Sequence, residues 1–283
     1  MVCHVTIYAS GMSRLIEQRT NSDGFPKAGE LIEIHAMQEL TLQDRRVFNL
    51  LIENAGPQLA ADGWHEIAML KLRGPRHKGA ERVMDSLRRL MTTLVEVDAG
   101  KINGLEAVAT TVLGAENIRT VNEDDPRSVL RYKFTETLRN IITNSQYWGR
   151  IKAYVMFSFS SKYALTLYEA ICLRINLHTD EQVFTVDDFR RLIDVPKGKL
   201  ERAPDLMRRV VRPAVLEVNS LSDFTVDIEP LRAGGPTRGK LTGFRMRWAR
   251  KSKPEWQSVL DELMRPKVGR KARIHGTVEK ISA

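Results

Sequence analysis

The sequence contains few cysteines: Cys3 and Cys172 are the only two, and they stand far apart with neither a CxxC nor a metal-type spacing. A disulfide scaffold and a zinc finger are therefore excluded. No stretch approaches the roughly 18 consecutive apolar residues that a membrane-spanning helix needs. The N-terminus also lacks the charged segment and long apolar core of a secretory signal. We expect a reduced, soluble, cytoplasmic protein with no membrane partner.

The sequence also lacks the residue patterns of two kinds of enzyme. Its six histidines are scattered, with no HExxH motif and no His-x-His pair beside a candidate tyrosine nucleophile, as a DNA-nicking relaxase needs. The loop Gly234–Lys240 nearly completes a P-loop, but Leu241 stands where Ser or Thr must hold magnesium, and the following residues alternate like a strand. We therefore expect no enzyme activity, no cofactor and no metal site.

Basic residues, by contrast, are abundant: 44 Lys and Arg stand against 35 Asp and Glu, which gives a net charge of +9. Between Arg232 and Arg273, 13 basic residues face three acidic ones, so this segment holds the whole excess and the rest of the chain is nearly neutral. A smaller local excess lies between Arg73 and Arg89. Two separated basic zones favour two contacts with one polyanion. The alternative is a solvated face plus a disordered basic tail.

The first half of the chain shows helix signals after an arm of limited expected structure, residues 1–30. The clearest helix begins at Thr41, an N-cap candidate with Asp44 three residues later, and ends at Gly56. The elements predicted after it are a short helix over 65–71, a helix over 80–94, a strand at 94–97, and strands at 108–112 and 117–121 that pair with the strand at 94–97. Helix, helix, helix and β-hairpin is the order of a winged helix. An acidic turn, a strand-to-helix segment and a linker at 144–149 follow.

The second half repeats this order. Its predicted elements are a helix over SSKYALTLYEAICLRIN, a strand at 183–185, a helix over DDFRRLIDV, a long helix over DLMRRVVRPAVLEVNSL, and strands at 224–231 and 241–248 joined by a Gly-rich loop. The sequence predicts a short helix over 255–264 and a mobile tail beyond it. The predicted fold is mainly α-helical with small β-hairpins (α+β), as two tandem winged-helix domains over 31–143 and 150–250. A basic tail, 251–283, completes the chain.

The long helix of the second half is the best candidate for contact with DNA. Its apolar residues form a buried stripe, while Arg208 and Arg212 stand four apart on another face and project together. Arginine reads guanine O6 and N7 in the major groove and also contacts phosphates. The alternative is an exposed helix whose arginines pair with local acids such as Asp205. Pro213 predicts either a kink or a helix in two pieces.

Other basic residues surround this helix and its counterpart in the first half. In the wing, the apolar residues of 241–248 should face the core, while the arginines between them lie opposite Asp227 and Glu229 and are neutralised. The remaining candidates for contact with DNA are Arg76, Lys78, Arg82, Arg88 and Arg89 in the first half, Lys197, Lys199 and Arg202 before the long helix, and Arg232, Arg238 and Lys240 at the wing tip.

The chain resembles the iteron-binding plasmid replication initiators over about residues 30–250. Three segments carry the resemblance, in this order: LIEIHAMQELTLQDRRVFNLLIENA, SSKYALTLYEAI and RRVVRPAVLEVNSLSDFTVDIEPL. Members of that family have tandem winged helices. They recognise repeated DNA at a plasmid origin, help open it and recruit host initiation factors and the replicative helicase.

The resemblance implies that the helix carrying Arg208, Arg209 and Arg212 is the recognition helix of the second domain, and that Ala80–Leu94 plays this role in the first. It also implies a homodimer–monomer equilibrium through the first domain, with dimers repressing their own promoter. We therefore expect a plasmid replication initiator that binds directly repeated double-stranded DNA. The alternatives are a winged-helix transcriptional repressor without initiator activity and a DNA-nicking relaxase.

Overall fold

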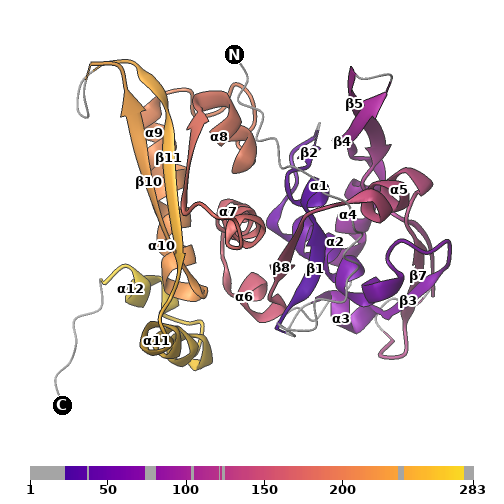
Figure 1. The fold of residues 1–283 in the computed structure, drawn as a ribbon. Helices are drawn as coiled ribbons and strands as arrows, with labels where there is room; N and C mark the ends of the chain where they lie inside the picture. The colour runs from indigo at the N-terminus through magenta and orange to yellow at the C-terminus, as the bar shows by residue number, and fades with distance from the viewer. Residues whose placement is uncertain are drawn as a thin grey trace.

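The computed structural model describes residues 23–36, 38–73, 81–102, 105–120, 122, 125–234 and 239–276. Figure 1 shows two winged-helix units side by side, followed by two C-terminal helices at the base of the second unit. The elements up to the junction are β1 (Phe25–Ala28), α1 (Gly29–Ile32), β2 (His35–Ala36), α2 (Leu42–Ala55), η1 (Gly56–Gln58), β3 (His65–Ala68), α3 (Met69–Arg73), α4 (Glu81–Thr92), β4 (Leu94–Ile102), β5 (Leu105–Val112), β6 (Glu116–Arg119), β7 (Val129–Lys133), α5 (Glu136–Asn144), β8 (Trp148–Ile151) and α6 (Ala153–Ser158).

The second unit and the C-terminal helices complete the chain. They comprise α7 (Lys162–Arg174), β9 (Glu181–Thr185), α8 (Val186–Leu192), α9 (Ala203–Leu206), a π-helical turn η2 (Met207–Val211), α10 (Arg212–Leu221), β10 (Phe224–Arg232), β11 (Leu241–Arg250), α11 (Lys253–Met264) and α12 (Arg270–Ile274). We call α9, η2 and α10 together the recognition helix.

The two units share one topology. In the second, the sheet order is β10-β11-β9, and in the first the corresponding order is β3-β7-β6. In each unit the short strand before the second helix pairs with the last strand, which also pairs with the strand before it. The helices correspond as α2 to α7, α3 to α8 and α4 to the recognition helix. The α+β fold with tandem winged helices is therefore confirmed.

Helix α2 begins as its sequence predicts. The Thr41 side chain accepts a hydrogen bond from the Asp44 backbone N–H, and the Asp44 carboxylate accepts one from the Thr41 N–H, which closes a capping box. The following Gly56 adopts a φ of 52° that ends the helix. The helix predicted over 80–94 is α4, whose buried face consists of Val83, Leu87 and Leu90 together with their neighbours.

Strand pairing in the first unit differs from the sequence prediction. Strands β4 and β5 pair with each other as expected, but their sheet continues to β2, and β6 pairs with β7 instead of β4. Relative to the second unit, the hairpin β4–β5 is therefore an insertion. The wing of the first unit is the loop between β6 and β7. Pairing partners depend on packing between distant segments more than on strand propensity, so the sequence pattern alone did not identify them.

Three segments assigned from sequence as arm, short helix and linker contain paired strands. Residues 25–28 form β1 and pair with β8, in the register Phe25 to Ile151, which also places a strand in the predicted linker. Residues His65–Ala68 form β3, and only the following α3 is helical. Residues 1–22 lie outside the described part of the chain. The second half matches its predicted order, with Ser161 capping α7.

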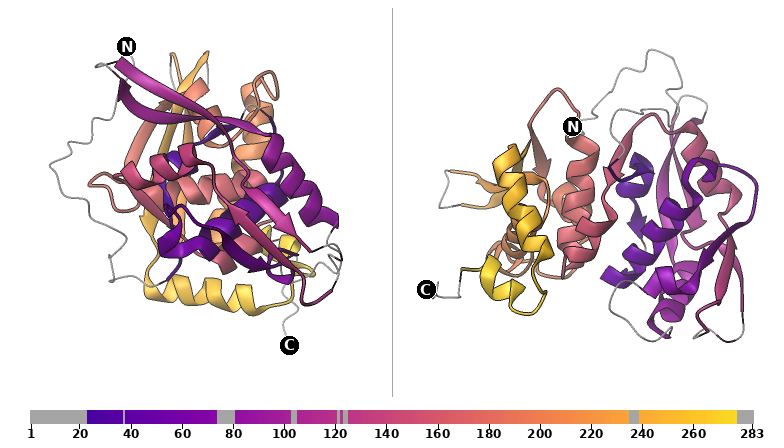
Figure 2. Two further views of the ribbon diagram at one scale, coloured as in Figure 1. Left: turned by 90° about the vertical axis from the view of Figure 1, so that its right-hand side faces the viewer. Right: turned by 90° about the horizontal axis from the view of Figure 1, so that it is seen from below.

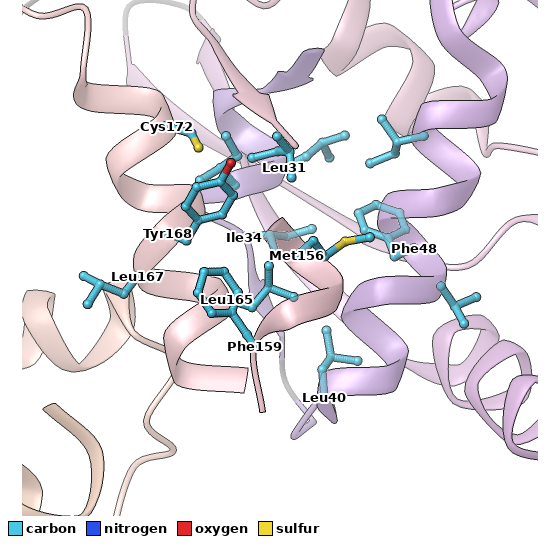
Figure 3. Packing of buried hydrophobic residues seen from close by; sticks show 14 of the residues in the cluster. Leu31, Ile34, Leu40, Phe48, Met156, Phe159, Leu165, Leu167, Tyr168 and Cys172 are labelled. Atoms are coloured by element: carbon cyan, nitrogen blue, oxygen red, sulfur yellow. The ribbon is translucent and has the colours of Figure 1, made fainter. Parts of the chain in front are cut away.

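A single hydrophobic core runs through both units. Figure 3 shows Phe48 of α2 on one side and Leu165, Tyr168 and Cys172 of α7 on the other, with Met156 of α6 between them. All of these side chains are buried. The contiguous packing means that the two winged helices share an apolar interface and are not separated by an exposed linker.

The C-terminal segment is folded at least to residue 276, so the expectation of a mobile tail is wrong there. Ser252 and Glu255 form a capping box at the start of α11. Three arginines of the segment, Arg265, Arg270 and Arg273, lie 2.8–3.6 Å from Glu262, which joins α11 to α12. Figure 2 shows these yellow helices lying against the second unit. These three arginines of the basic tail therefore make structural contacts with Glu262.

Candidate DNA-binding surface

The recognition helix is continuous, but it changes its hydrogen bonding just before Pro213. Proline has no N–H, and its ring clashes with the carbonyl four residues earlier in a regular α-helix. Here the Arg212 N–H donates to the carbonyl of Met207, five residues earlier, so the turn before the proline is widened to a π-helix. This widened turn carries Arg208 and Arg209. The proline therefore produces neither a break nor two separate helices.

Two polar side chains that the sequence analysis did not identify hold this helix against neighbouring segments. Glu217 is buried and accepts hydrogen bonds from the backbone N–H of Ser160 at 2.7 Å and from its hydroxyl. Asn219 accepts from the Val226 N–H at 2.7 Å and donates to the Val226 carbonyl at 3.0 Å, which ties the helix to β10. Both residues lie inside the helix predicted from the sequence. Their roles were not predicted, because the partner of Glu217 is distant in sequence and the partner of Asn219 lies across a turn.

The face opposite the core carries three exposed arginines. The side chains of Arg208 and Arg209 are 68% and 63% exposed, and Arg212 is also exposed. Asp205 lies 3.1 Å from Arg208 and 3.9 Å from Arg209. Such surface ion pairs contribute only about 0–1 kcal/mol, so a phosphate or base competes for them readily. Among the described residues Arg212 has no ion-pair partner, and the face keeps a net positive charge.

A basic turn, residues 196–202, leads into the recognition helix and is held in shape by Arg190 of α8. The Arg190 guanidinium donates to the carbonyls of Pro196 at 3.2 Å and Leu200 at 3.0 Å, and also to that of Lys199. Leu200 adopts a φ of 54°, which is uncommon for a residue with a side chain. Arg190 thus stabilises a strained turn from which Lys197, Lys199 and Arg202 project, all of them exposed.

The wing strands follow the expected alternation. Phe244, Met246 and Trp248 are buried. Arg245 lies 3.3 Å from Glu229 across the hairpin, and Arg247 lies 3.0 Å from Glu181 of β9 and 3.8 Å from Asp227. These arginines are therefore neutralised. At the base of the tip, Arg232 donates to the Gly239 carbonyl and Lys240 is exposed, while Arg238 lies outside the described residues.

The basic elements of the second unit gather at one end. Figure 1 shows α9, α8 and the tips of β10 and β11 together at the upper end of the second unit, away from α11 and α12. We call the exposed basic residues of the recognition helix, the turn at 196–202 and the wing base together the basic face. Its composition suits a polyanion that presents both base edges and phosphates.

The first unit offers less to a polyanion. On α4, Arg82 is exposed and Arg88 pairs at 3.0 Å only with the exposed Asp85. Arg89, which the sequence suggested as a DNA contact, makes a two-pronged ion pair with the fully buried carboxylate of Asp44, at 2.8–3.1 Å. This pairing docks α4 on the start of α2 and gives Arg89 a structural role.

Two other features of the first unit bear on contact with DNA. Arg76 and Lys78 lie outside the described residues. The wing loop between β6 and β7 contains the sequence NEDDPR, and there Arg127 pairs with Asp125 at 2.8 Å. An acidic wing repels phosphates, so among the described elements of the first unit α4 is a better candidate for contact with DNA than the wing.

Two other features are absent from the described part of the chain. No group of three His, Cys, Asp or Glu side chains there is placed to hold a metal ion. Of the helices described, none combines the length and apolar character that crossing a membrane requires.

The two units share three corresponding helices and a corresponding three-stranded sheet in the same order, and this arrangement defines a tandem winged-helix protein. The family described as "Initiator Replication protein, WH1" matches residues 27–172, and "Initiator Rep protein, WH2" matches residues 185–248. The chain belongs to this family and is a replication initiator protein. The first match extends through β8 and α6 into α7, and the second ends before α11, so the C-terminal helices lie beyond both matches.

Comparison with other proteins adds a distant likeness. A solved structure described as "Crystal structure of the RctB domains 2-3, RctB-155-483" is similar over 80% of this chain and 88% of that chain, at 10% sequence identity and a TM-score of 0.38. No curated protein matches the chain.

Proposed function

We propose that this replication initiator binds directly repeated double-stranded DNA at a plasmid origin, helps to open it and recruits the host replication initiator and replicative helicase. One observation supports DNA binding above the others. Three exposed arginines lie on a recognition helix whose opposite side is buried, and the basic turn and wing flank them. The recruitment of host proteins rests on the family alone.

The basic face divides into two kinds of contact. Arg208 and Arg212 project from the recognition helix and read bases in the major groove, whereas Lys240 at the wing base contacts phosphates. A bidentate arginine–guanine contact gives about 1–3 kcal/mol of discrimination against the wrong base. A phosphate contact gives affinity without sequence preference and contributes about 0.9 to the salt slope of binding.

Fluorescence anisotropy with repeat DNA, single-base variants of the repeat and a scrambled duplex tests this division. Arg212→Ala should weaken binding to the repeat by about 1–3 kcal/mol and remove the preference at one base pair. Lys240→Ala should weaken all duplexes alike and reduce the salt slope by about 0.9. The reverse pattern, with Lys240 setting base preference, contradicts the assignment.

A dimer formed through the first unit is part of the proposal. Strand β5 lies at the edge of the sheet β2-β4-β5, its sequence LEAVATTV contains neither lysine nor proline, and Leu105 and Val108 are 73% and 63% exposed. An edge strand without such residues is open to pairing with a second copy. Val108→Lys should shift sedimentation from dimer to monomer, and a wild-type protein that is monomeric at all concentrations contradicts the proposal.

Replication itself separates an initiator from a repressor of the same fold. A plasmid carrying this gene and its flanking repeats should replicate in a host that lacks the gene, and should fail to replicate with Arg212→Ala. Repression of the promoter without any replication favours the repressor. We propose that the protein is not an enzyme, so incubation with supercoiled origin DNA and Mg²⁺ or Mn²⁺ should give no covalent protein–DNA adduct, whereas an adduct identifies a relaxase.

A further inference from the structure

A carboxylate of the first unit lies between two lysines of the second. Glu39, in the segment between β2 and α2, has one oxygen 3.1 Å from the Lys162 ammonium at the start of α7, and its other oxygen accepts a hydrogen bond from Lys199. The neighbouring Leu40 is buried and enters the shared core on the same side as Phe159 (Figure 3). Glu39 is therefore held at the junction of the two units.

Two cations lie beside Glu39 at this junction, Lys162 and Lys199. Asp194 already lies 3.1 Å from Lys162 and 3.0 Å from Arg45, so it is shared by two cations. Lys199 has no other acidic partner among the described residues. Hydrogen bonds from Lys199 and Lys162 hold the pKa of Glu39 below its usual value, which keeps the carboxylate ionised at neutral pH. Glu39 thus neutralises a lysine of the basic face.

Lys199 belongs to the basic turn that leads into the recognition helix, and its side chain is 59% exposed. A non-bridging oxygen of a DNA backbone phosphate carries a partial negative charge and accepts from an ammonium, as one carboxylate oxygen of Glu39 does here from Lys199. We propose that Glu39 occupies the position of a DNA phosphate on Lys199 in the free protein, so that DNA binds there only by displacing it. This inference rests on the proposed DNA-binding function.

The displacement has a measurable cost in affinity. An exposed ion pair of this kind corresponds to a factor of about two to five in an equilibrium constant. Glu39→Gln removes the competing anion, so DNA affinity should rise by about that factor on every duplex, because phosphates carry no sequence information. The gain requires Lys199, and this requirement distinguishes displacement from a general change in net charge.

A double-mutant cycle tests the proposal by fluorescence anisotropy on repeat DNA and on a scrambled duplex. The proteins are wild type, Glu39→Gln, Lys199→Gln and the double variant. The matched control is Glu201→Gln, which removes an equal charge from an exposed acid of the same turn that pairs with no lysine among the described residues. Thermal melts establish that every variant is folded.

We expect Glu39→Gln to bind both duplexes about two to five times more tightly, the double variant to bind no more tightly than Lys199→Gln, and Glu201→Gln to change affinity less than Glu39→Gln. An equal gain for Glu39→Gln and Glu201→Gln, or a gain that persists without Lys199, overturns the proposal. If Arg212→Ala weakens binding while Glu39→Gln equals wild type, only this inference fails. If Arg212→Ala has no effect, the proposed DNA-binding function fails.

Discussion

Two neighbouring arginines of α4, Arg88 and Arg89, provide a matched test of structural against surface roles. Arg89 makes three contacts of 2.8–3.1 Å with the oxygens of Asp44, whose side chain is fully buried and also caps α2. Among the described residues, Arg88 has Asp85 as its one ion-pair partner, and both of these side chains are exposed. Replacing Arg89 with Ala therefore leaves a buried carboxylate without its cation, whereas replacing Arg88 does not.

The magnitude follows from the exposure of the partners. A hydrogen bond to a charged group contributes about 1.5–3 kcal/mol when it is buried. The Arg89 side chain is 43% exposed, so solvent screens the pair and reduces its contribution to about 1–2 kcal/mol. Arg89→Ala should then lower the melting temperature by roughly 2–3 °C in a protein of this size. Arg88→Ala should change the free energy of unfolding by less than about 0.5 kcal/mol.

The same pair makes the effect depend on pH. Burial raises the pKa of Asp44, but hydrogen bonds from Arg89, Ser86 and Thr41 outweigh burial and lower it below its usual value. A carboxyl group with a lowered pKa stabilises the fold above its unfolded pKa, and this stabilisation is lost as pH falls through the lowered value. Urea unfolding of wild type and Arg89→Ala should differ most near neutral pH and converge in acid. If the two arginine variants are equally stable at neutral pH, the structural role of Arg89 is refuted.

Three further predictions concern contacts that stabilise the second unit. Arg190→Ala should release the turn at 196–202 and weaken binding to all duplexes several-fold in anisotropy, whereas Arg191→Ala, an exposed neighbour on α8, should not. Glu217→Gln should lower the free energy of unfolding by about 1–2 kcal/mol in urea titrations, since one buried acceptor of Ser160 is lost. A chain ending at Arg250 lacks the helices α11 and α12 and should melt at a lower temperature while keeping its base preference.

Local signals in the sequence were sufficient for the longer helices. The capping residues Thr41 and Asp44 fixed the start of α2, and Ser161 fixed the start of α7, because a cap depends on residues within a single turn. The spacing of apolar residues identified α4 and the recognition helix, because this pattern is likewise contained within a single helix. The alternation of β10 and β11 correctly placed Arg245 and Arg247 opposite acids, since cross-strand neighbours follow from a hairpin register.

Contacts between distant segments account for what the sequence did not reveal. The pairing of β1 with β8, more than 100 residues later, leaves no local pattern in Phe25–Ala28. Which loop is the wing of the first unit depends on whether β6 pairs with β4 or with β7, and the sequence pattern does not distinguish the two. Arg89 looked like an exposed arginine because its partner, Asp44, is 45 residues earlier. The same holds for Glu39 and Lys199, which come from different units.

Guanine methylation interference on the repeat DNA tests the central claim most directly, because methylation at N7 blocks the major-groove position that a bidentate arginine occupies. For wild type, we expect interference at guanines within each repeat, and for Arg212→Ala we expect one of these positions to become insensitive while the others remain. Identical patterns for the two proteins, or wild-type binding that no guanine methylation affects, would contradict recognition by this helix.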